Sequence, residues 1–549
     1  MSHPVQPIAR GTLSNMLRTM AQNRPLGEAL VYPAFAFGGQ EVRLTFSELD
    51  SLVDSLAKGL IAQGIQAGEH VAIWGTNVPD WVPLQFALAR VGAVLVTVNT
   101  ALRKEEVAYV LQQSKSVAII HTTSTGTNSP SAILDDLFAE AHPAVSQIRR
   151  RIWMPANPSD SPPGTLATVS GTVKKGRSVF DADLATREAH IDSGDVVNIQ
   201  YTSGTTGFPK GVMLSHDNLM HSAWSIAQQI NTQPEDRLAM ILPLFHCFGC
   251  VVCVLGAYSH GATLCVIPSF NPEDALRLVH EERCTILHGV PTMFSAMLAH
   301  PERHRFDTSC LERGLAAGSP VPEPLMARII DELKCEGMSI AYGLTEAAPG
   351  VAGTRPSDPL EVRCSTIGQP LPGVEVNIVD PATGKAVPDG QRGELLCRGV
   401  NVMVGYHNDD EATKEAVTQD GWLKTGDEAL RRQDGNLSIV GRIKDIIIRG
   451  GENVAPAEVE SLLIEHPDLA DAAVVGIPDE HLGEEVACAV LLKKDVQFNP
   501  EAYASYLEDR LSFFKIPKVW KALEAFPLTG SGKVKKFLLR EMLSEPLEE

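Results

Sequence analysis

The sequence has no long apolar run and no excess of positive charge. Its longest apolar stretches, such as 91–98 and 251–255, fall far short of the roughly 20 residues that a helix needs to span a bilayer, so we expect no integral membrane segment. The 549 residues carry 47 Lys and Arg against 67 Asp and Glu, a formal net charge of −20. Such a chain is a poor candidate for bulk binding to nucleic acid or to an anionic membrane. A polyanionic ligand would therefore need a local site of N–H donors, lysines and metal ions.

Signals for export and a disulfide framework are also missing. The N-terminus lacks the basic and apolar regions of a signal peptide, and the C-terminus carries no peroxisomal or lipidation signal, so we expect a cytoplasmic protein with reduced thiols. Cys247, Cys250 and Cys253 have the spacing of part of an iron–sulfur motif. Their neighbours are Val, Leu and Gly, and no Cys-Pro follows. We therefore expect apolar packing beside a pocket there rather than a metal cluster.

Helix-like and strand-like segments alternate along the chain, which favours a largely parallel sheet covered by helices. Strands are predicted at 71–74, 94–98, 196–200, 212–214, 285–288 and 339–342, and helices at 46–64, 83–90 and 291–298. The segments 122–130 and 155–177, rich in Ser, Thr, Gly and Pro, are predicted to be surface loops. Short strands separated by Gly and Pro turns at 372–400 indicate a small β-rich unit.

The last ~100 residues have the size of a separate domain. Helices are predicted there at 457–464 and 501–511, and strands at 472–477 and 486–492. The charged segment 441–445 precedes them and is typical of a joint between domains. We therefore expect an α/β protein with a large N-terminal domain of mixed β-sheets covered by helices, which includes the small β-rich unit, and an α+β C-terminal domain.

The most informative stretch is YTSGTTGFPKG at 201–211, which packs hydroxyl side chains, three glycines and a lysine into eleven residues. It lies between the strands predicted at 196–200 and 212–214. A glycine-rich turn with many N–H and hydroxyl donors suits the oxygens of a polyphosphate, and Lys210 adds positive charge. The loop is not a Walker A motif, because Lys210 is followed by glycine and a strand instead of Ser or Thr and a helix. A P-loop phosphotransferase is therefore excluded.

Six further short motifs follow this loop. They are LPLFHCFG at 242–249, GSP at 318–320, AYGLTE at 341–346, GWLKTGD at 421–427, GRIKD at 441–445 and PLTGSGK at 527–533. In order and content the seven motifs resemble the adenylate-forming (AMP-binding) superfamily, which includes acyl-CoA synthetases, peptide-synthetase adenylation domains and beetle luciferases. The resemblance covers essentially the whole chain.

The resemblance implies an acid–thiol ligase that uses ATP, Mg²⁺ and coenzyme A. A carboxylate would attack the α-phosphorus of ATP to give acyl-AMP and pyrophosphate, and the CoA thiol would then displace AMP to give a thioester. A carboxylate is already ionised at neutral pH and needs no general base. The difficulty is the approach of two negative groups, so positioning and electrostatic relief should dominate catalysis.

The resemblance also implies which residues form the ATP site. The phosphates would be held by Thr202, Ser203, Gly204, Thr205, Thr206 and Gly207, with Lys210 nearby. Adenine would contact Tyr342 and Gly343 and the backbone of Gly318, Ser319 and Pro320, while Asp427 and Arg442 would serve the ribose. Glu346 is a hard oxygen donor suited to Mg²⁺, with Thr202 sharing the ion, and Thr345 would donate to the α-phosphate.

The same resemblance makes 1–441 the adenylation domain, 442–445 a hinge, and 446–549 a mobile domain that carries a catalytic lysine, Lys533. Lys533 would neutralise the α-phosphate and the incoming carboxylate. Rotation about Lys444 would then exchange the Lys533 face for a face that bears Gly450 and Gly451, where the pantetheine arm of CoA can pass close to the backbone.

The acid itself is less constrained. His246 lies where the family places a residue beside the substrate carboxylate, and we expect it to gate or position rather than to transfer protons. The predicted pocket wall, 247–253 with 314–317 and 347–348, is small and apolar, which favours an uncharged acid over an amino acid. We expect a medium-chain fatty acid, with a short branched or aryl acid as the alternative. A free-standing ligase that loads a carrier protein and a homodimer both stay open, whereas a non-catalytic nucleotide-binding regulator is disfavoured because Glu346 and Lys533 are both present.

Overall fold

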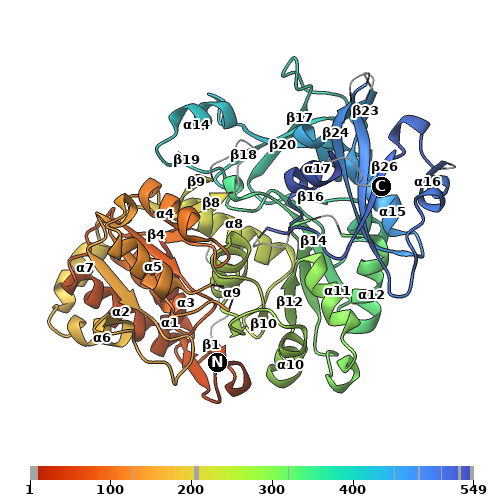
Figure 1. The fold of residues 1–549 in the computed structure, drawn as a ribbon. Coiled ribbons are helices and arrows are strands. Elements are labelled where there is room, and N and C mark those ends of the chain that lie inside the picture. Colours follow the sequence, from red (N-terminus) through yellow and green to blue (C-terminus); the bar gives the residue numbers. More distant parts are fainter. Residues whose placement is uncertain are drawn as a thin grey trace.

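The computed structural model describes residues 10–126, 128–202, 209–319, 321–449, 452–479, 482–508, 510–529 and 533–544. Within these ranges, Lys444, Glu452 and Asn453 are described by their backbone alone. Among these residues the strands form four sheets (Figure 1). The two large sheets are built mainly from the part of the chain coloured red to green, and the two smaller ones from the cyan and blue part.

The first large sheet has the strand order β19-β9-β8-β4-β3-β5-β6-β7. Its strands are β3 (His70–Trp74), β4 (Val94–Thr97), β5 (Ala118–His121), β6 (Arg150–Trp153), β7 (Ala167–Thr168), β8 (Val196–Thr202), β9 (Lys210–Ser215) and β19 (Gly405–Tyr406). The run from β8 to β7 is parallel, and β9 and β19 add to it in antiparallel fashion. Helices α4 (Lys104–Gln113) and α5 (Pro130–Ala139) cover one face, and α2 (Phe46–Ala62) and α3 (Trp81–Arg90) the other, so the inner strands are apolar on both sides.

The second large sheet has the order β16-β15-β14-β13-β12-β10-β11-β1-β2, parallel from β14 to β1 and antiparallel at both edges. Its strands are β1 (Glu28–Tyr32), β2 (Val42–Thr45), β10 (Arg237–Met240), β11 (Thr263–Val266), β12 (Ile286–Gly289), β13 (Arg313–Ala317), β14 (Gly337–Tyr342), β15 (Ala352–Gly353) and β16 (Gln369–Pro370). Helices α10 (Pro272–Glu282), α11 (Pro291–Ala299) and α12 (Glu323–Leu333) pack on one face. On the other face, α1 (Leu13–Asn23), α8 (His216–Gln229), α9 (Gly256–His260) and the π-helix Phe248–Leu255 share one core with the first sheet.

The two smaller sheets come from the last third of the chain. The third consists of the antiparallel strands β17 (Val374–Val379), β18 (Gly393–Gly399), β20 (Leu423–Arg431) and β21 (Leu437–Arg442). The fourth contains β22 (Ile447–Arg449), β23 (Glu452–Val454), β24 (Leu469–Asp479), β25 (Gly483–Leu492) and β26 (Val519–Leu523). Helices α15 (Pro456–Ile464) and α16 (Pro500–Glu508) pack on one side of this sheet and α17 (Lys536–Ser544) on the other. The turn Ile443–Asp445 connects the two sheets.

The predicted α/β class is confirmed, and the predicted strands and helices correspond to observed ones, with helix ends that differ by a few residues. The loop predicted at 155–177 is wrong in its second half, which forms β7 and α6 (Val169–Gly176). Thr168 caps this helix by accepting a hydrogen bond from the Gly171 amide at 2.9 Å. The helix packs closely on α2, where a Cβ on Gly59 would lie 2.2 Å from the Thr172 carbonyl oxygen. Small residues, which suggested a loop, here permit two helix backbones to approach.

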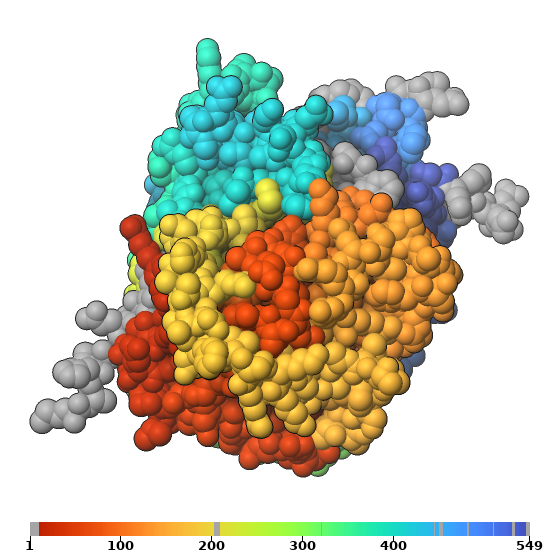
Figure 2. Space-filling model, turned by 90° about the vertical axis from the view of Figure 1, so that its left-hand side faces the viewer, coloured from red at the N-terminus to blue at the C-terminus, as the bar shows by residue number. Residues whose placement is uncertain are grey.

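An open hollow of about 780 Å³ lies at the amino ends of β3, β4 and β8, with lining residues that include His70, Val94 and Val196. Figure 2 looks onto this face, where the recess lies between the yellow and the red-orange segments. None of its lining residues is a predicted site residue. Thr202 lies at the opposite, carboxyl end of β8, the edge where open α/β sheets bind their ligands. Separately, no helix in the described part of the chain is both long and apolar enough to cross a membrane.

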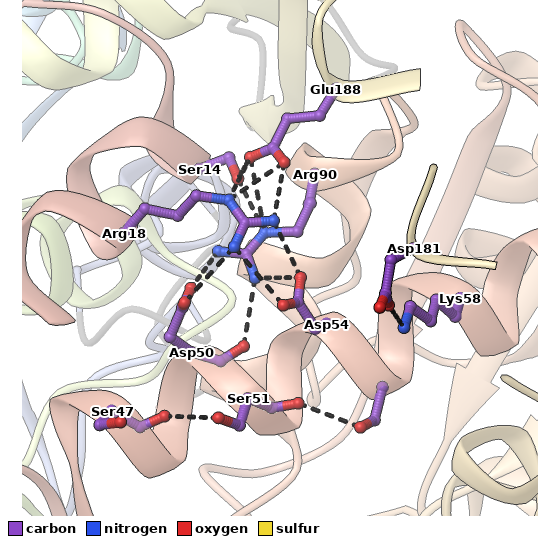
Figure 3. Close-up of polar contacts among 11 residues, drawn as sticks. Ser14, Arg18, Ser47, Asp50, Ser51, Asp54, Lys58, Arg90, Asp181 and Glu188 are labelled. Atoms are coloured by element: carbon purple, nitrogen blue, oxygen red, sulfur yellow. Dashed lines mark hydrogen bonds and ion pairs between the residues drawn. The ribbon is translucent and has the colours of Figure 1, made fainter. Parts of the chain in front are cut away.

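An ionic network fastens the helices around the first sheet. Arg90, at the end of α3, is fully buried and pairs with Asp50 and Asp54 of α2 at 2.5 and 2.9 Å. Arg18 of α1 shares Asp54 at 2.9 Å and pairs at 2.7 Å with Glu188, the last residue of α7 (Asp181–Glu188). Figure 3 shows the two guanidinium groups side by side among the three carboxylates. The network therefore joins four helices that come from distant parts of the sequence.

Candidate active site

The phosphate-type loop connects two paired strands. Thr202 ends β8 and is the register partner of Lys210, which begins β9. Ser203, Gly204, Thr205, Thr206 and Gly207 lie outside the described residues, so their predicted phosphate contacts stay predictions. Helix α4 holds both flanks of the loop, because the Tyr109 hydroxyl donates to the Pro209 carbonyl at 3.0 Å and the Tyr201 hydroxyl donates to Gln113.

The second part of the site follows two neighbouring parallel strands, β13 and β14, whose carboxyl ends meet at the same edge. Gly318 directly follows β13 with φ +92°, a left-handed conformation that favours glycine. Gly343 directly follows β14, and a Cβ there would lie 1.4 Å from the Pro349 carbonyl oxygen, so no other residue fits. Ser319 is exposed next to Gly318, and Pro320 lies outside the described residues.

Asp427 is the centre of a polar triad. It is only 5% exposed and accepts hydrogen bonds from the Tyr342 hydroxyl at 2.5 Å and from Arg442 Nε at 3.1 Å. Asp427 and Arg442 are register partners on β20 and β21, while Tyr342 ends β14 of another sheet. Burial and the Asp427 charge raise the pKa of Tyr342 well above 10, so it stays a neutral donor. The structure thus brings together the three residues expected at the nucleoside.

Glu346 lies in the turn Thr345–Ala347 after β14 and has a partner that the sequence analysis missed. The Tyr406 hydroxyl donates to Glu346 Oε1 at 2.9 Å, and Lys210 Nζ lies 5.0 Å from the centre of the Tyr406 ring. Tyr406 belongs to β19, which pairs with β9 beside Lys210. No motif marks Tyr406 in the sequence, and its contact to Glu346 spans 60 positions, so only the fold reveals it.

The residues present fit a nucleotide-bound Mg²⁺. Glu346 Oε2 makes no hydrogen bond to the described residues, which leaves one carboxylate oxygen for a cation. Mg²⁺ is commonly held by one or two carboxylates together with substrate phosphates. Glu346 would hold the ion and Thr202 could share it, and a bound Mg²⁺ would offset negative charge on the phosphates.

His246 and Cys247 precede the π-helix Phe248–Leu255, and Cys247 reaches Thr345. His246 Nδ1 accepts a hydrogen bond from the Phe248 amide at 3.1 Å, and Cys247 Sγ lies 3.7 Å from Thr345 Oγ1. Burial, with a contribution from Lys533, lowers the pKa of His246 to about 4, so the ring is neutral near pH 7. A neutral ring held by its own backbone suits the positioning role expected for His246.

The cysteines of this segment are packed in the apolar core. Cys247, Cys250 and Cys253 are free and buried in the same core as Leu315, Ala317, Ala347 and Ala348. Cys250 Sγ accepts a hydrogen bond from Gln200 Nε2 at 3.1 Å, and the ring of Phe248 stacks on that of His288 at 6.2 Å. The segments predicted to form the pocket wall thus all contribute residues to one apolar core.

Lys533 comes from the far end of the chain and lies at the same site. Its side chain keeps solvent-exposed surface, but protein surrounds the ammonium. This desolvation and the charge of Arg442 lower the pKa of Lys533 below its ordinary value of 10.5, while Cys247, Asp427 and Glu346 act in the opposite direction. The ammonium is thus within electrostatic reach of Arg442, Asp427 and Glu346.

The neighbouring lysine, Lys536, points elsewhere. Its Nζ donates to Glu460 Oε1 at 2.7 Å and to the Val474 carbonyl at 3.1 Å, within the fourth sheet and its helices. The Lys533 amide donates to Thr529 Oγ1 at 3.0 Å, which orients the backbone before α17. Of the other residues predicted for this part of the chain, Gly450 and Gly451 lie outside the described residues, and Lys444 is described only as backbone of the turn Ile443–Asp445.

Comparison with known proteins places this geometry in a family. Residues 17–407 match the model of the AMP-binding enzyme family, and residues 458–533 match the model of the AMP-binding enzyme C-terminal domain. The chain is 41% identical over 552 residues to YngI of Bacillus subtilis (strain 168), whose name places it provisionally among acyl-CoA synthetases, with 98% of each chain covered. It is 36% identical over 556 residues to the mitochondrial medium-chain acyl-CoA ligase ACSF2 of Mus musculus, covering 100% of this chain and 90% of the mouse protein.

A solved structure agrees with these relatives. The crystal structure of ATP-bound MatB from Rhodopseudomonas palustris superimposes with a TM-score of 0.82 at 27% identity, over 97% of this chain and 99% of MatB. The resemblance found in the sequence motifs is thereby confirmed, and this chain belongs to the AMP-binding (adenylate-forming) enzyme family.

Proposed function

We propose that this protein is an AMP-forming acyl-CoA synthetase, an acid–thiol ligase that uses ATP and coenzyme A. The observation that carries the proposal is the triad of Tyr342, Asp427 and Arg442, with Glu346 in the turn that follows the strand of Tyr342. These residues suit the ribose and the metal–phosphate end of ATP, and Lys533, from the C-terminal part of the chain, is within electrostatic reach of them. Relatives that match this chain over nearly its full length are named as acyl-CoA ligases, which supports a thioester as the product.

In the first half-reaction a carboxylate oxygen of the acid forms a bond to the α-phosphorus, and the bond from that phosphorus to the bridging oxygen of pyrophosphate breaks. Lys533 would lie between the two anions and offset their repulsion, while Thr345 donates to the α-phosphate. Asp427 would accept from the ribose hydroxyls, since its carboxylate oxygens have lone pairs beyond those used by Tyr342 and Arg442. His246, neutral and anchored, would border the carboxylate.

In the second half-reaction the CoA sulfur attacks the acyl carbon, the bond from that carbon to the AMP oxygen breaks, and the thiol proton passes to solvent. We propose that residues 446–549 rotate about the hinge 442–445 between the two steps, which withdraws Lys533 and presents Gly450 and Gly451. The turn Ile443–Asp445 is a short link between two separate sheets, which supports a pivot there.

For the acid, we propose a medium-chain fatty acid, with short branched or aryl acids as the alternative. The small thiols of Cys247 and Cys250, together with Ala317 and Ala347, are uncharged and belong to the apolar core that follows His246 in the chain. We also propose CoA rather than a carrier protein as the acceptor, and a homodimer. For the location we propose the cytoplasm, with mitochondria as the alternative because the ACSF2 relatives are named as mitochondrial. Light scattering tests the oligomeric state directly.

The test separates the two half-reactions. Acid-dependent pyrophosphate release should depend on chain length, and AMP should be the nucleotide product. Lys533→Ala should lower acyl-AMP formation by at least about 100-fold, because a single donor to a developing charge contributes on the order of 2.7–4 kcal/mol. Thioester formation from supplied acyl-AMP and CoA should fall far less.

Lys535→Ala is the matched control, because Lys535 is two positions away in the same segment and should leave both half-reactions near the parent rates. Equal loss of both half-reactions in Lys533→Ala would contradict the proposed division of labour. Formation of ADP, or ATP consumption that needs no carboxylic acid, would overturn the proposed function itself.

A further inference from the structure

The segment 400–408 forms a strap across the phosphate end of the site. The Met403 amide donates to the Glu346 carbonyl at 2.9 Å, the Val404 amide to the Met213 carbonyl at 3.0 Å, and the His407 amide to the Gly211 carbonyl at 2.7 Å. The strap therefore joins the turn that carries Glu346 to the strand that begins with Lys210.

The strap is itself held firmly. Asn218 Nδ2 donates to the carbonyls of Val400 and Val402 at 2.7 and 3.0 Å, and Gln113 Nε2 donates to the His407 carbonyl at 2.6 Å. The Tyr406 amide donates to Thr413 Oγ1 at 2.8 Å. A strap with this many fixed points can hold a side chain in one orientation.

Tyr406 is the strap residue whose side chain touches both groups expected at the phosphates. It is 9% exposed, its hydroxyl donates to Glu346 Oε1, and its ring lies under the Lys210 ammonium. Tyr406 therefore contacts a carboxylate through its hydroxyl and an ammonium through its ring face at the same time.

The two contacts do different work. The hydroxyl fixes Glu346 Oε1 and so directs the other carboxylate oxygen, Oε2, away from Tyr406. The ring face attracts Lys210 through a cation–π contact and limits where its ammonium can lie. Both effects reduce the ordering that a metal–nucleotide complex would otherwise require on binding.

We propose that Tyr406 is a positioning residue for the metal–phosphate end of the nucleotide site, acting through Glu346 and Lys210 without touching substrate. The inference rests on the proposed function, in which Glu346 faces Mg²⁺ and Lys210 faces phosphate. It adds a residue that lies in none of the seven motifs found in the sequence.

The test measures binding of a metal and a nucleotide, not only turnover. Mn²⁺ affinity is measured by electron paramagnetic resonance in the presence of a non-hydrolysable ATP analogue, and affinity for the same analogue in EDTA is measured by calorimetry. Tyr406→Phe should weaken Mn²⁺ binding roughly tenfold, as expected for loss of a hydrogen bond to a charged group. Metal-free nucleotide affinity should change less than twofold.

Tyr406→Leu also removes the ring, so metal-free nucleotide affinity should fall by a further two- to fivefold, on the order of a surface cation–π contact. The matched control is Tyr32→Phe, which removes a buried hydroxyl that donates to the Val78 carbonyl at 3.0 Å in the second large sheet, away from Glu346 and Lys210. This control should leave Mn²⁺ affinity unchanged, even if it lowers Tm.

A double-mutant cycle tests whether Tyr406 affects Mn²⁺ binding through Glu346. In a Glu346→Gln background, Tyr406→Phe should cause no further loss of Mn²⁺ affinity, because the group it orients has been altered. Additive losses, an unchanged Mn²⁺ affinity in Tyr406→Phe, or an equal effect in Tyr32→Phe would each overturn the inference. If the parent protein forms acyl-AMP and binds Mn²⁺ with the analogue, any of these results overturns the role of Tyr406 but leaves the proposed function intact. If the parent protein does neither, the proposed function and the role of Tyr406 are both wrong.

Discussion

Replacing Arg90 with methionine should destabilise the protein without reaching the active site. Arg90 is fully buried and holds Asp50 and Asp54, and its Nε donates to Ser14 Oγ at 2.8 Å. Methionine fills much of the same space but leaves two carboxylates beside Glu188 with Arg18 as their remaining partner (Figure 3). The change therefore uncovers like charges instead of removing a balanced pair.

The magnitude follows from how buried the partners are. Removing one member of a buried ion pair costs about 3–5 kcal/mol. The Asp50 and Asp54 side chains are 17% and 33% exposed, so they can regain some hydration. We therefore expect the lower end, about 3 kcal/mol, which lowers Tm by about 3 °C for a domain of roughly 440 residues with an unfolding entropy of about 2.1 cal/mol/K per residue. Differential scanning calorimetry at pH 7 measures the Tm difference between the parent and Arg90→Met. Scans at several rates show whether unfolding is irreversible.

Acid provides the second part of the test. Burial alone would raise the pKa of Glu188, but hydrogen bonds from Arg18 and Ser14 and the charge of Arg90 hold it below its ordinary value of 4.5. A lowered pKa in the folded state means that the stabilisation is present above pH 4.5 and is lost as pH falls through the folded-state value. The Tm difference between parent and Arg90→Met should therefore shrink below about pH 4.5.

Lys58→Met is the control, because Lys58 pairs with the exposed Asp181 across the same helices and exposed pairs contribute little. An Arg90→Met protein as stable as this control at pH 7, or a Tm gap that persists unchanged in acid, would refute the electrostatic reasoning.

Three further outcomes are expected. Asp427→Asn should weaken AMP binding about tenfold in calorimetry, because a charged acceptor for the ribose is lost; unchanged affinity would remove Asp427 from the site. His246→Gln should leave the shape of the pH–rate profile between pH 6 and 8 unchanged, since the His246 pKa is about 4; loss of a limb in that range would assign His246 a proton-transfer role. Burial raises the pKa of the Cys247 thiol to about 11, so iodoacetamide at pH 7.5 should label the half-buried Cys310 before Cys247 in peptide mass spectrometry; the reverse order would contradict the burial.

Some of the fold and site could be predicted because the relevant signals are local. The apolar run before Tyr201 and the one after Gly211 predict the hairpin β8–β9, and glycine between strands predicts its turn. Gly343 and Gly318 lie in short motifs and also meet steric demands that a side chain cannot satisfy.

Contacts across long sequence separations could not be predicted. The pairing of Arg18 with Glu188 spans 170 positions. The motifs placed Tyr342 and Asp427 at the same nucleotide, but the direct hydrogen bond between them spans 85 positions and was not predicted. Tyr406 becomes informative only when β19 is seen to pair with β9. Helix α6 was missed because its polar and glycine-rich sequence is stabilised by contact with α2, a tertiary effect that outweighs local propensity.

The distribution of the site along the chain has a consequence during synthesis. A ribosome adds residues from the N-terminus, so a nascent chain that has not reached Asp427 lacks the carboxylate of the polar triad, and one that has not reached Lys533 lacks the cation. Ligands stabilise only the conformation that binds them. At the proposed site, ATP would therefore not assist the early folding of the two large sheets, and its protection would begin only after Asp427 and Lys533 have been added.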